Sequence, residues 1–353
     1  MTRVERLAAL LDEPLLVAGP PYVLGGQANV RYLTGLASSN AAVLVEPDGT
    51  ATLFADFRYA ARGREVEGVT FVEVPRNLLA SLAEQLSGRR IAFEEANLPY
   101  AGYRVLADAG VEAVPTAGLV ESLRAVKDEE EIAIMRRAGA LSDLLFQGLS
   151  QQRFSGRTER ELVWWVERSL REAGAENVSF PTVVAAGETA TSPHAEPGDR
   201  TIEEGVLVVV DAGCVVDGYC SDCTRTFATG ELPAELREIY DVCLEAELRA
   251  LDEIRPGMGG READATARQV IEEAGYGERF GHGLGHGLGL LVHEAPSLRP
   301  ESADTLEPGQ VFSIEPGIYL SGRAGVRIED LVVLRDDGPE RLTTVEKELV
   351  LVD

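Results

Sequence analysis

The stretch from Gly281 to Glu294, GHGLGHGLGLLVHE, restricts what this chain can build more than any other part of the sequence. It contains three of the four histidines of the chain, among glycines at every second position from Gly281 to Gly289. Glycines spaced in this way lack the pattern of a dinucleotide-binding loop, and no Gly-Lys-Ser/Thr follows to cradle a phosphate. We therefore expect the histidines to carry the function of this segment.

The net charge of −26 at pH 7 limits the partners of the chain. Nucleic acids and anionic membranes bind clustered Lys and Arg, so we expect neither as a partner. No stretch approaches the roughly 18 uninterrupted apolar residues of a membrane span, and the first residues lack the long apolar core of a secretory signal. These features favour a cytoplasmic protein.

Four cysteines, at positions 214, 220, 223 and 243, include the pair CSDC with the spacing of a redox or zinc motif. A single pair of this kind is weak evidence. On a strand, Cys220 and Cys223 would also point to opposite faces. We expect reduced and chemically inert thiols.

The first part of the chain, residues 1–122, reads as alternating strands and helices. The segment AAVLVEPDGTATLFAD carries two apolar runs around Asp48-Gly49, which predicts a hairpin. Strand-like VTFVEV and RIAFEE then alternate with helical NLLASLAEQL and YAGYRVLADAG. We predict a mixed α/β domain.

The second part, residues 123–353, opens with a long amphipathic helix whose acidic first turn spans residues 128–131, as the helix dipole favours. Thr158 and Glu161 stand at capping-box spacing before another helix. Strands are predicted at VLVVVDAG, YCSDCTRTFA, QVFSIEPGIYL and GVRIEDLVVL. Helices and hairpins in this order predict an α+β domain.

Two carboxylates converge in the first hairpin of this domain. If Asp217-Gly218 closes a tight turn, Asp211 and Asp222 lie on the same face as diagonal neighbours, about 7 Å apart at Cβ. Two buried like charges are costly together, so the pair indicates a cation between them.

A second hairpin repeats this arrangement. With its loop centred on Gly322, Glu315 stands opposite Glu329, and both lie in apolar strands where a lone carboxylate is expensive. Four carboxylates on strands, with at least one histidine, form the ligand set of a dinuclear centre for divalent metal ions. Such ligands suit manganese, cobalt, zinc or iron, and we favour manganese.

These motifs carry a resemblance. Asp211, then Asp222, then GHGLGHGLGLLVHEAP, then IEPG at Glu315 and VRIED at Glu329 resemble the pita-bread metallopeptidases, a group that includes methionine aminopeptidase, aminopeptidase P and prolidase. The upstream FPTVVAAGETATSPHA resembles the histidine segment of that family. The first 120 residues resemble the creatinase-type N-terminal domain of its proline-specific branch.

The resemblance implies the metal ligands. One ion would be bound by Asp211, Asp222 and Glu329, and the other by Asp222, His286, Glu315 and Glu329. Asp222 and Glu329 would bridge the two ions.

The resemblance also implies the roles of the other histidines. His293 would face the substrate carbonyl as a catalytic residue, together with Glu315 as proton shuttle and His194 near the leaving side. His282 would be an additional histidine on the substrate side, typical of the proline-specific members.

Two further side chains follow from strand periodicity. Arg327 shares a strand face with Glu329, and Tyr319 shares one with Glu315. We expect Arg327 to hold a bridging carboxylate, and both residues to lie on the substrate side of the centre. Thr224 and Arg225 are weaker candidates of the same kind.

The resemblance implies hydrolysis of the bond between an N-terminal residue and a following proline in a peptide. Prolidases often place an arginine four residues after the second catalytic histidine, to bind the carboxylate of a dipeptide. That position is Ser297 here, and Arg299 lies two residues later. This departure favours an aminopeptidase P, with a prolidase as the alternative.

Other members of the group fit less well. A methionine aminopeptidase usually lacks the N-terminal domain, and a creatinase lacks the dinuclear site. A non-catalytic binding module with the same fold is the alternative from another class, and the five intact ligands argue against it. The resemblance also implies a homodimer or larger assembly through the N-terminal domain.

Overall fold

The computed structural model describes residues 1–352 and divides into two compact units, one from Met1 to Arg124 and one from Ala125 onward. The sequence placed a boundary after residue 122. No helix in this described range is long and apolar enough to cross a membrane.

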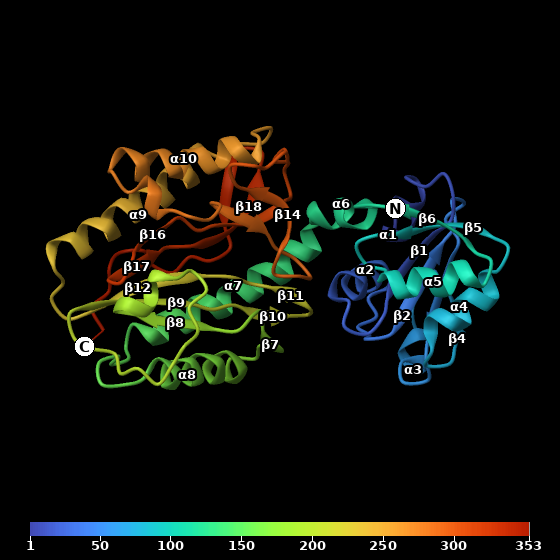
Figure 1. The fold of residues 1–353 in the computed structure, drawn as a ribbon, viewed down its shortest axis with the longest axis horizontal. Coiled ribbons are helices and arrows are strands. Elements are labelled where there is room, and N and C mark those ends of the chain that lie inside the picture. The colour runs from blue at the N-terminus through green and yellow to red at the C-terminus, as the bar shows by residue number, and fades with distance from the viewer. Residues whose placement is uncertain (353) are drawn as a thin grey trace. The chain divides into compact units, whose positions relative to one another are not determined.

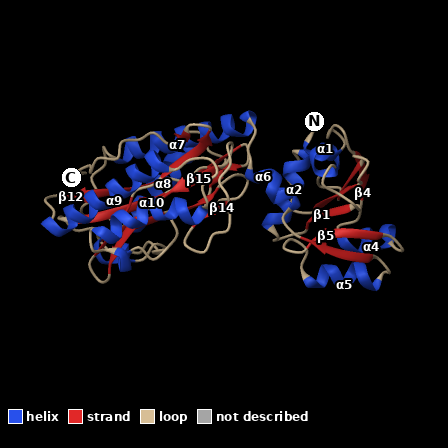
Figure 2. Ribbon diagram, turned by 90° about the horizontal axis from the view of Figure 1, so that it is seen from above, coloured by secondary structure: helices blue, strands red, loops and turns tan. Residues whose placement is uncertain are grey.

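The first unit is built on a six-stranded mixed sheet, with helices on both faces (Figure 2). Its strands, in the spatial order β4-β3-β2-β1-β5-β6, are β1 (Leu15–Gly19), β2 (Ala41–Val45), β3 (Ala51–Ala55), β4 (Thr70–Glu73), β5 (Arg90–Glu94) and β6 (Glu112–Thr116). Its helices are α1 (Arg3–Ala8), α2 (Leu24–Thr34), α3 (Ala60–Gly63), α4 (Leu78–Leu86), α5 (Tyr100–Asp108) and α6 (Leu119–Ala125), whose last residue belongs to the second unit.

Alternation along the strands supplies two layers of core in this unit. On β1, Leu16 and Ala18 join the apolar cluster that α4 and α5 complete, whereas Leu15 and Val17 are buried on the other face. Strands β2 and β3 form the predicted hairpin, and Gly49 in its turn adopts a φ of 87°, which glycine tolerates. The predicted α/β domain is confirmed.

The second unit places its strands between two helix pairs (Figure 1). The helices are α7 (Glu129–Leu149), α8 (Glu159–Glu172), α9 (Ala234–Glu253) and α10 (Gly260–Glu273). Helices α7 and α8 share one apolar cluster with a three-stranded sheet, and α9 and α10 share another with the strands near the end of the chain. This is the α+β architecture that the sequence predicts.

The strands of the second unit form four small sheets. Two of them contain three strands each, β8 (Val183–Ala186), β9 (Val206–Asp211) and β12 (Thr224–Thr229), and β7 (Asn177–Val178), β10 (Cys214–Val216) and β11 (Tyr219–Cys220). The others are β13 (Gly285–Gly287), β14 (Glu294–Leu298), β15 (Val311–Ile314), β18 (Asp330–Arg335) and β19 (Gly338–Arg341), and the pair β16 (Gly317–Leu320) and β17 (Ala324–Arg327).

Three predicted strands are each broken in two, which corrects the sequence analysis. The strand expected over residues 219–228 is interrupted around Asp222, the strand over 310–320 at Glu315, and the strand over 325–334 at Glu329. At each break the chain leaves one ladder and joins another, as when β15 pairs with β18 and β16 pairs with β17. An apolar pattern records burial but not a change of pairing partner, so the sequence did not reveal the breaks.

The helix starts follow the predicted capping. Helix α7 begins after Asp128, and α8 begins after Thr158, whose Oγ1 accepts a hydrogen bond of 3.2 Å from the backbone N–H of Glu161. The Glu161 carboxylate accepts one of 2.8 Å from the N–H of Thr158 in return. Both ends of this capping box are therefore made.

Replacing the N-cap residue of α8 tests whether this capping box stabilises the helix. The variant Thr158→Ala removes one half of the box and is expected to lower the free energy of unfolding of the second unit by about 1 kcal/mol. Ser169→Ala, in the last turn of the same helix, is the control and should be neutral or stabilising by up to about 0.5 kcal/mol. Urea unfolding followed by circular dichroism compares them, and equal effects of the two changes would contradict the capping role.

Candidate metal centre

The first two carboxylates meet where β9 ends. Asp211 is the last residue of β9 and pairs with Thr224 on β12, so Asp222, two residues earlier, is its diagonal neighbour. Asp217 and Gly218 close the turn between β10 and β11, as predicted. Asp211, Asp222 and Glu329 each offer a carboxylate oxygen, and these atoms all lie within 4.8 Å of one another.

Glu315 and Glu329 lie in the gaps between two ladders. Ile314 pairs with Asp330 on one side, and Gly317 pairs with Arg327 on the other. The same register across the gap sets Glu315 opposite Glu329, as the hairpin centred on Gly322 predicts. Because these two residues belong to no ladder, their side chains can turn toward Asp211 and Asp222.

His286 on β13 brings a nitrogen to this cluster. Its Nε2 lies 3.3 Å from Glu315 Oε1 and 3.9 Å from Asp222 Oδ2. The hydroxyl of Ser313 accepts a 3.1 Å hydrogen bond from the backbone N–H of His286 and donates one of 3.1 Å to Glu315 Oε1. Ser313 therefore orients two of the expected ligands, a role that the sequence analysis missed although Ser313 shares a strand face with Glu315.

The glycines on either side of His286 are required by close packing. A Cβ atom at Gly285 would lie 1.9 Å from the carbonyl oxygen of Ser313, and one at Gly287 would lie 2.1 Å from that of Ala295. No side chain fits such gaps, so only glycine lets β13 approach its two neighbouring strands.

The electrostatics of the cluster fit a bound cation. Burial, followed by neighbouring carboxylates, raises the pKa of Asp222 and of Glu329 well above their ordinary values, and burial raises the pKa of Glu315. Asp211 Oδ1, Asp222 Oδ1 and Glu329 Oε1 are buried and accept no hydrogen bond from residues 1–352. Divalent ions would satisfy both the charge and these oxygens, so the residues present fit the dinuclear centre.

Arg327 supports a different carboxylate from the one expected. Its buried guanidinium donates a 2.6 Å hydrogen bond to Asp211 Oδ2 and one of 3.1 Å to Thr224 Oγ1, and Thr224 in turn donates one of 2.7 Å to Glu329 Oε2. We expected Arg327 to hold the bridging Glu329 itself. It reaches Glu329 only through Thr224, because the strand break at 328–329 turns the two side chains apart.

A cavity of about 520 Å³ opens over the cluster. All four histidines line it, and so do the five expected metal ligands and Arg327. The rings of His286 and His293 are 4.2 Å apart at their centroids. Burial lowers the pKa of His282, His286 and His293, which keeps these imidazoles neutral near pH 7.

Tyr319 lies behind the cavity wall and not on it, which corrects its expected place facing the substrate. Its hydroxyl is within 2.9 Å of His282 Nε2 and accepts a 3.0 Å hydrogen bond from Arg327. The side chain is buried against these two partners, so it orients His282 and Arg327.

The cysteines stand apart from this chemistry. All four are free and buried, as expected of inert thiols. Burial raises the pKa of Cys214, Cys223 and Cys243, so none of these three is a thiolate at neutral pH.

An α/β domain followed by an α+β domain with four carboxylates and a histidine around one cavity defines a metal-dependent hydrolase. The model of metallopeptidase family M24 matches residues 133–336, and that of the creatinase/prolidase N-terminal domain matches residues 3–126. The chain therefore belongs to metallopeptidase family M24 and is a hydrolase, which confirms the resemblance.

Individual relatives cover the whole chain. An uncharacterised peptidase of Bacillus subtilis is 38% identical over 338 residues, which are 94% of this chain and 95% of that protein. The structure of an Xaa-Pro dipeptidase from Bacillus anthracis is 37% identical, with a TM-score of 0.93 over 99% of both chains. That of an X-Pro aminopeptidase from Thermotoga maritima is 34% identical, with a TM-score of 0.90 over 98% of this chain and 100% of that one. Five further similar structures are named prolidases or dipeptidases.

The raised pKa values predict that metal binding releases protons. Burial and neighbouring carboxylates raise the pKa of Asp222 and of Glu329, so in the metal-free protein these carboxylates keep their protons to a higher pH than free carboxyl groups do, whereas His286, whose pKa burial lowers, is already neutral. Raising the pH removes the competing protons, so the affinity for Mn²⁺ should rise about tenfold per pH unit for each proton released. Calorimetric titration in buffers of different ionisation enthalpy counts these protons, and heats that do not depend on the buffer would contradict the prediction.

Proposed function

We propose that this chain is an Xaa-Pro dipeptidase that hydrolyses the peptide bond before a C-terminal proline with two divalent metal ions. The observation that carries the proposal is the convergence of Asp211, Asp222, His286, Glu315 and Glu329 in one cavity that Arg299 also lines. Membership of family M24 and the dipeptidases among its relatives support it.

The proposal replaces our preference for an aminopeptidase P. That preference rested on Ser297, which stands where prolidases often carry an arginine. Ser297 and Arg299 both line the cavity, and Arg299 follows directly after the last residue of β14. An exposed arginine at 299 can therefore approach a dipeptide carboxylate from the same wall, so Ser297 does not argue for an open pocket.

Side chains of this chain would stabilise the developing charge and transfer the proton. When bound, the two ions would supply Lewis-acid activation of water and of the scissile carbonyl. His293 would donate a hydrogen bond to the carbonyl oxygen as negative charge develops there. Glu315, whose pKa burial raises, suits a group that takes a proton and returns it to the prolyl nitrogen as that nitrogen leaves.

The remaining cavity residues would place the substrate. His282, held by Tyr319 and by the carbonyl of Gly283, presents a fixed imidazole edge. His194 lies on the exposed rim and would face the leaving proline. The nitrogen of the scissile bond belongs to proline and carries no hydrogen, so binding of the prolyl residue depends on shape and on its carboxylate.

The proposal retains manganese as the first metal to test and a homodimer through the first unit. Tyr22, Phe57 and Tyr100 of that unit are exposed aromatic side chains, which suits a contact surface. We retain a cytoplasmic location on the composition alone.

Substrate length is the first test. The manganese-loaded protein should cleave an Xaa-Pro dipeptide with a higher kcat/KM than an Xaa-Pro tetrapeptide. Preference for the tetrapeptide would indicate an aminopeptidase P, and inactivity on both with two ions bound would favour a binding module.

Arg299→Met tests the carboxylate contact. Losing a hydrogen bond to a charged group costs about 1.5–3 kcal/mol, so KM for the dipeptide should rise about 10- to 100-fold while the tetrapeptide is affected less than about threefold. Arg249→Met, at an exposed arginine of α9, is the control and should change neither. Equal effects on both peptides would remove Arg299 from the proposal.

His293→Ala tests the carbonyl contact. Removing one oxyanion donor should lower kcat by about 10²–10³ while two metal ions per chain remain bound, as measured by elemental analysis beside the kinetics. A kcat within about threefold of the unchanged protein would exclude this role for His293.

A further inference from the structure

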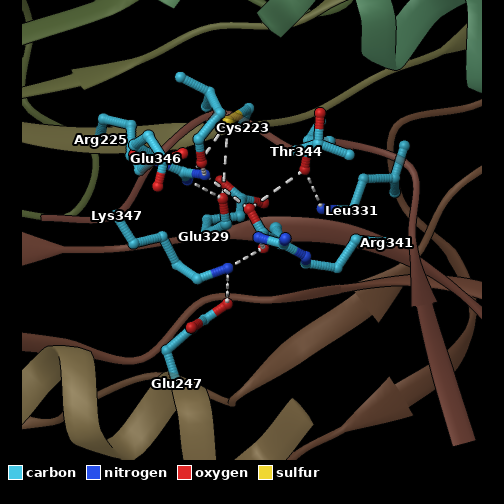
Figure 3. A network of polar contacts seen from close by, with 12 residues as sticks. Cys223, Arg225, Glu247, Glu329, Leu331, Arg341, Thr344, Glu346 and Lys347 are labelled. Carbon is cyan, nitrogen blue, oxygen red and sulfur yellow. Dashed lines mark hydrogen bonds and ion pairs between the residues drawn. The ribbon is translucent and has the colours of Figure 1, made fainter.

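Behind the metal centre lies a second group of charged side chains, which we call the rear network: Arg225, Glu247, Asp330 and Lys347. Figure 3 labels Arg225, Glu247 and Lys347 among them. Their side chains are at most 8% exposed. None of the four lines the cavity over the metal centre. The rear network is therefore separate from the substrate, and the reaction proposed above does not use it.

Arg225 connects this network to the metal ligands. It lies on β12, three residues after Asp222, and its Nη1 donates a hydrogen bond to the main-chain carbonyl of Glu329. Its Nη2 donates hydrogen bonds of 2.7 Å to Asp330 Oδ1 and to the carbonyl of Val345, and its Nε donates one of 3.0 Å to the carbonyl of Glu346. One guanidinium thus joins the strand after Asp222 to the segment that carries Glu329.

The strand break at Glu329 explains why this connection is needed. Glu329 lies between β17 and β18, outside both ladders. Its N–H donates a 3.1 Å hydrogen bond to the carbonyl of Thr224, and its carbonyl accepts from Arg225. Strand β12 therefore supplies the contacts that a ladder partner would otherwise give to the main chain of Glu329.

Alternation divides these contacts between two faces. On the cavity side, the hydroxyl of Thr224 donates to the carboxylate of Glu329. On the rear side, Arg225, which follows Thr224, forms an ion pair with Asp330, which follows Glu329. The position of Glu329 relative to Asp222 is thus fixed from both sides. Ions about 3.5–4 Å apart need bridging carboxylates at a defined separation, so these contacts bear directly on the second ion.

We propose that Arg225 is a positioning residue for the metal centre, which fixes the main chain of Glu329 against the strand that follows Asp222. The proposal rests on the proposed function, because it takes Asp222 and Glu329 as the bridging ligands. It concerns metal binding and assigns Arg225 no contact with the substrate.

The charged side chains around Arg225 compensate the cost of burying its guanidinium. Asp330 neutralises the guanidinium, and Lys347 contacts the other oxygen of Asp330 and lies 3.4 Å from Glu247 Oε1. The four buried side chains carry two positive and two negative charges, and the exposed Arg341 also approaches Asp330 Oδ2, at 3.4 Å. Substituting buried ion pairs by apolar residues often leaves the free energy of unfolding unchanged. A contribution to stability alone therefore explains the rear network poorly.

Arg225→Lys tests the proposal, because lysine keeps the charge but cannot reach the carbonyls of Glu329, Val345 and Glu346 and the carboxylate of Asp330 together, as a planar guanidinium does. Metal-free protein is titrated with Co²⁺, by calorimetry and by visible absorption. The second Co²⁺ should bind about 10- to 100-fold more weakly than in the unchanged protein, with an altered absorption spectrum.

The matched control removes the Lys347–Glu247 ion pair and, with it, the contact of Lys347 with Asp330, but no contact of Arg225. In the double variant Lys347→Met with Glu247→Leu, the charge balance is kept and every contact of Arg225 with Glu329 remains. The affinity for the second Co²⁺ should change less than about threefold, because no ligand loses its support. Equal weakening in the two variants would overturn a specific role for Arg225.

The unchanged protein separates this inference from the proposed function. If it fails to take up two Co²⁺ ions, the metal centre and the proposed function are wrong together. If it binds two ions and Arg225→Lys binds both with the same affinities and spectrum, only the positioning role is overturned.

If Arg225→Lys does not fold, hydrogen exchange of the unchanged protein provides a second test of the proposal. Coupling through Arg225 predicts that Co²⁺ slows amide hydrogen exchange in residues 343–347 by about tenfold, since linkage between sites is reciprocal. This segment holds no expected ligand and contacts Arg225 through two carbonyls. Protection confined to the ligand-bearing segments would overturn the proposal.

Discussion

Repulsion among buried carboxylates is the constraint on which the second unit of this protein depends. Asp222, Glu315 and Glu329 are held close together, and the burial that raises the pKa of each makes their joint ionisation costly. Neighbouring side chains lower this electrostatic cost. Arg327 neutralises Asp211, Ser313 and Thr224 donate to Glu315 and Glu329, and a neutral His286 adds a ligand without adding a charge.

The same constraint accounts for the irregular strands. A regular ladder would leave successive side chains alternating between faces, and only some of these carboxylates would reach one point. Breaking the strands at Asp222, Glu315 and Glu329 frees each residue from its ladder. The backbone groups released in this way must find other partners, and at Glu329 these are Thr224 and Arg225 of β12 and Cys223 directly before it.

Much of this was predictable from the sequence, because hairpin register is local. The turns at Asp217-Gly218 and Gly322 bring Asp211 to Asp222 and Glu315 to Glu329, and the alternate glycines indicate unusually close strands. The strand breaks and the place of Tyr319 were not predictable, since both depend on contacts between distant segments. Arg225 shows the limit most clearly, because the acceptors that tie it to Glu329, Asp330 and Glu346 lie 104 to 121 residues further along the chain.

The long separation between the ligands has a consequence for biosynthesis. A nascent chain extended only as far as Arg327 already contains Asp211, Asp222, His286 and Glu315, but it lacks Glu329, the second of the proposed bridging carboxylates, and the carbonyls at 345 and 346 that hold Arg225. At about 5–20 residues per second, the ribosome exposes this incomplete acidic cluster for seconds before the missing contacts emerge. Capture of both metal ions is therefore a late event, completed only after the rear of the second unit has closed.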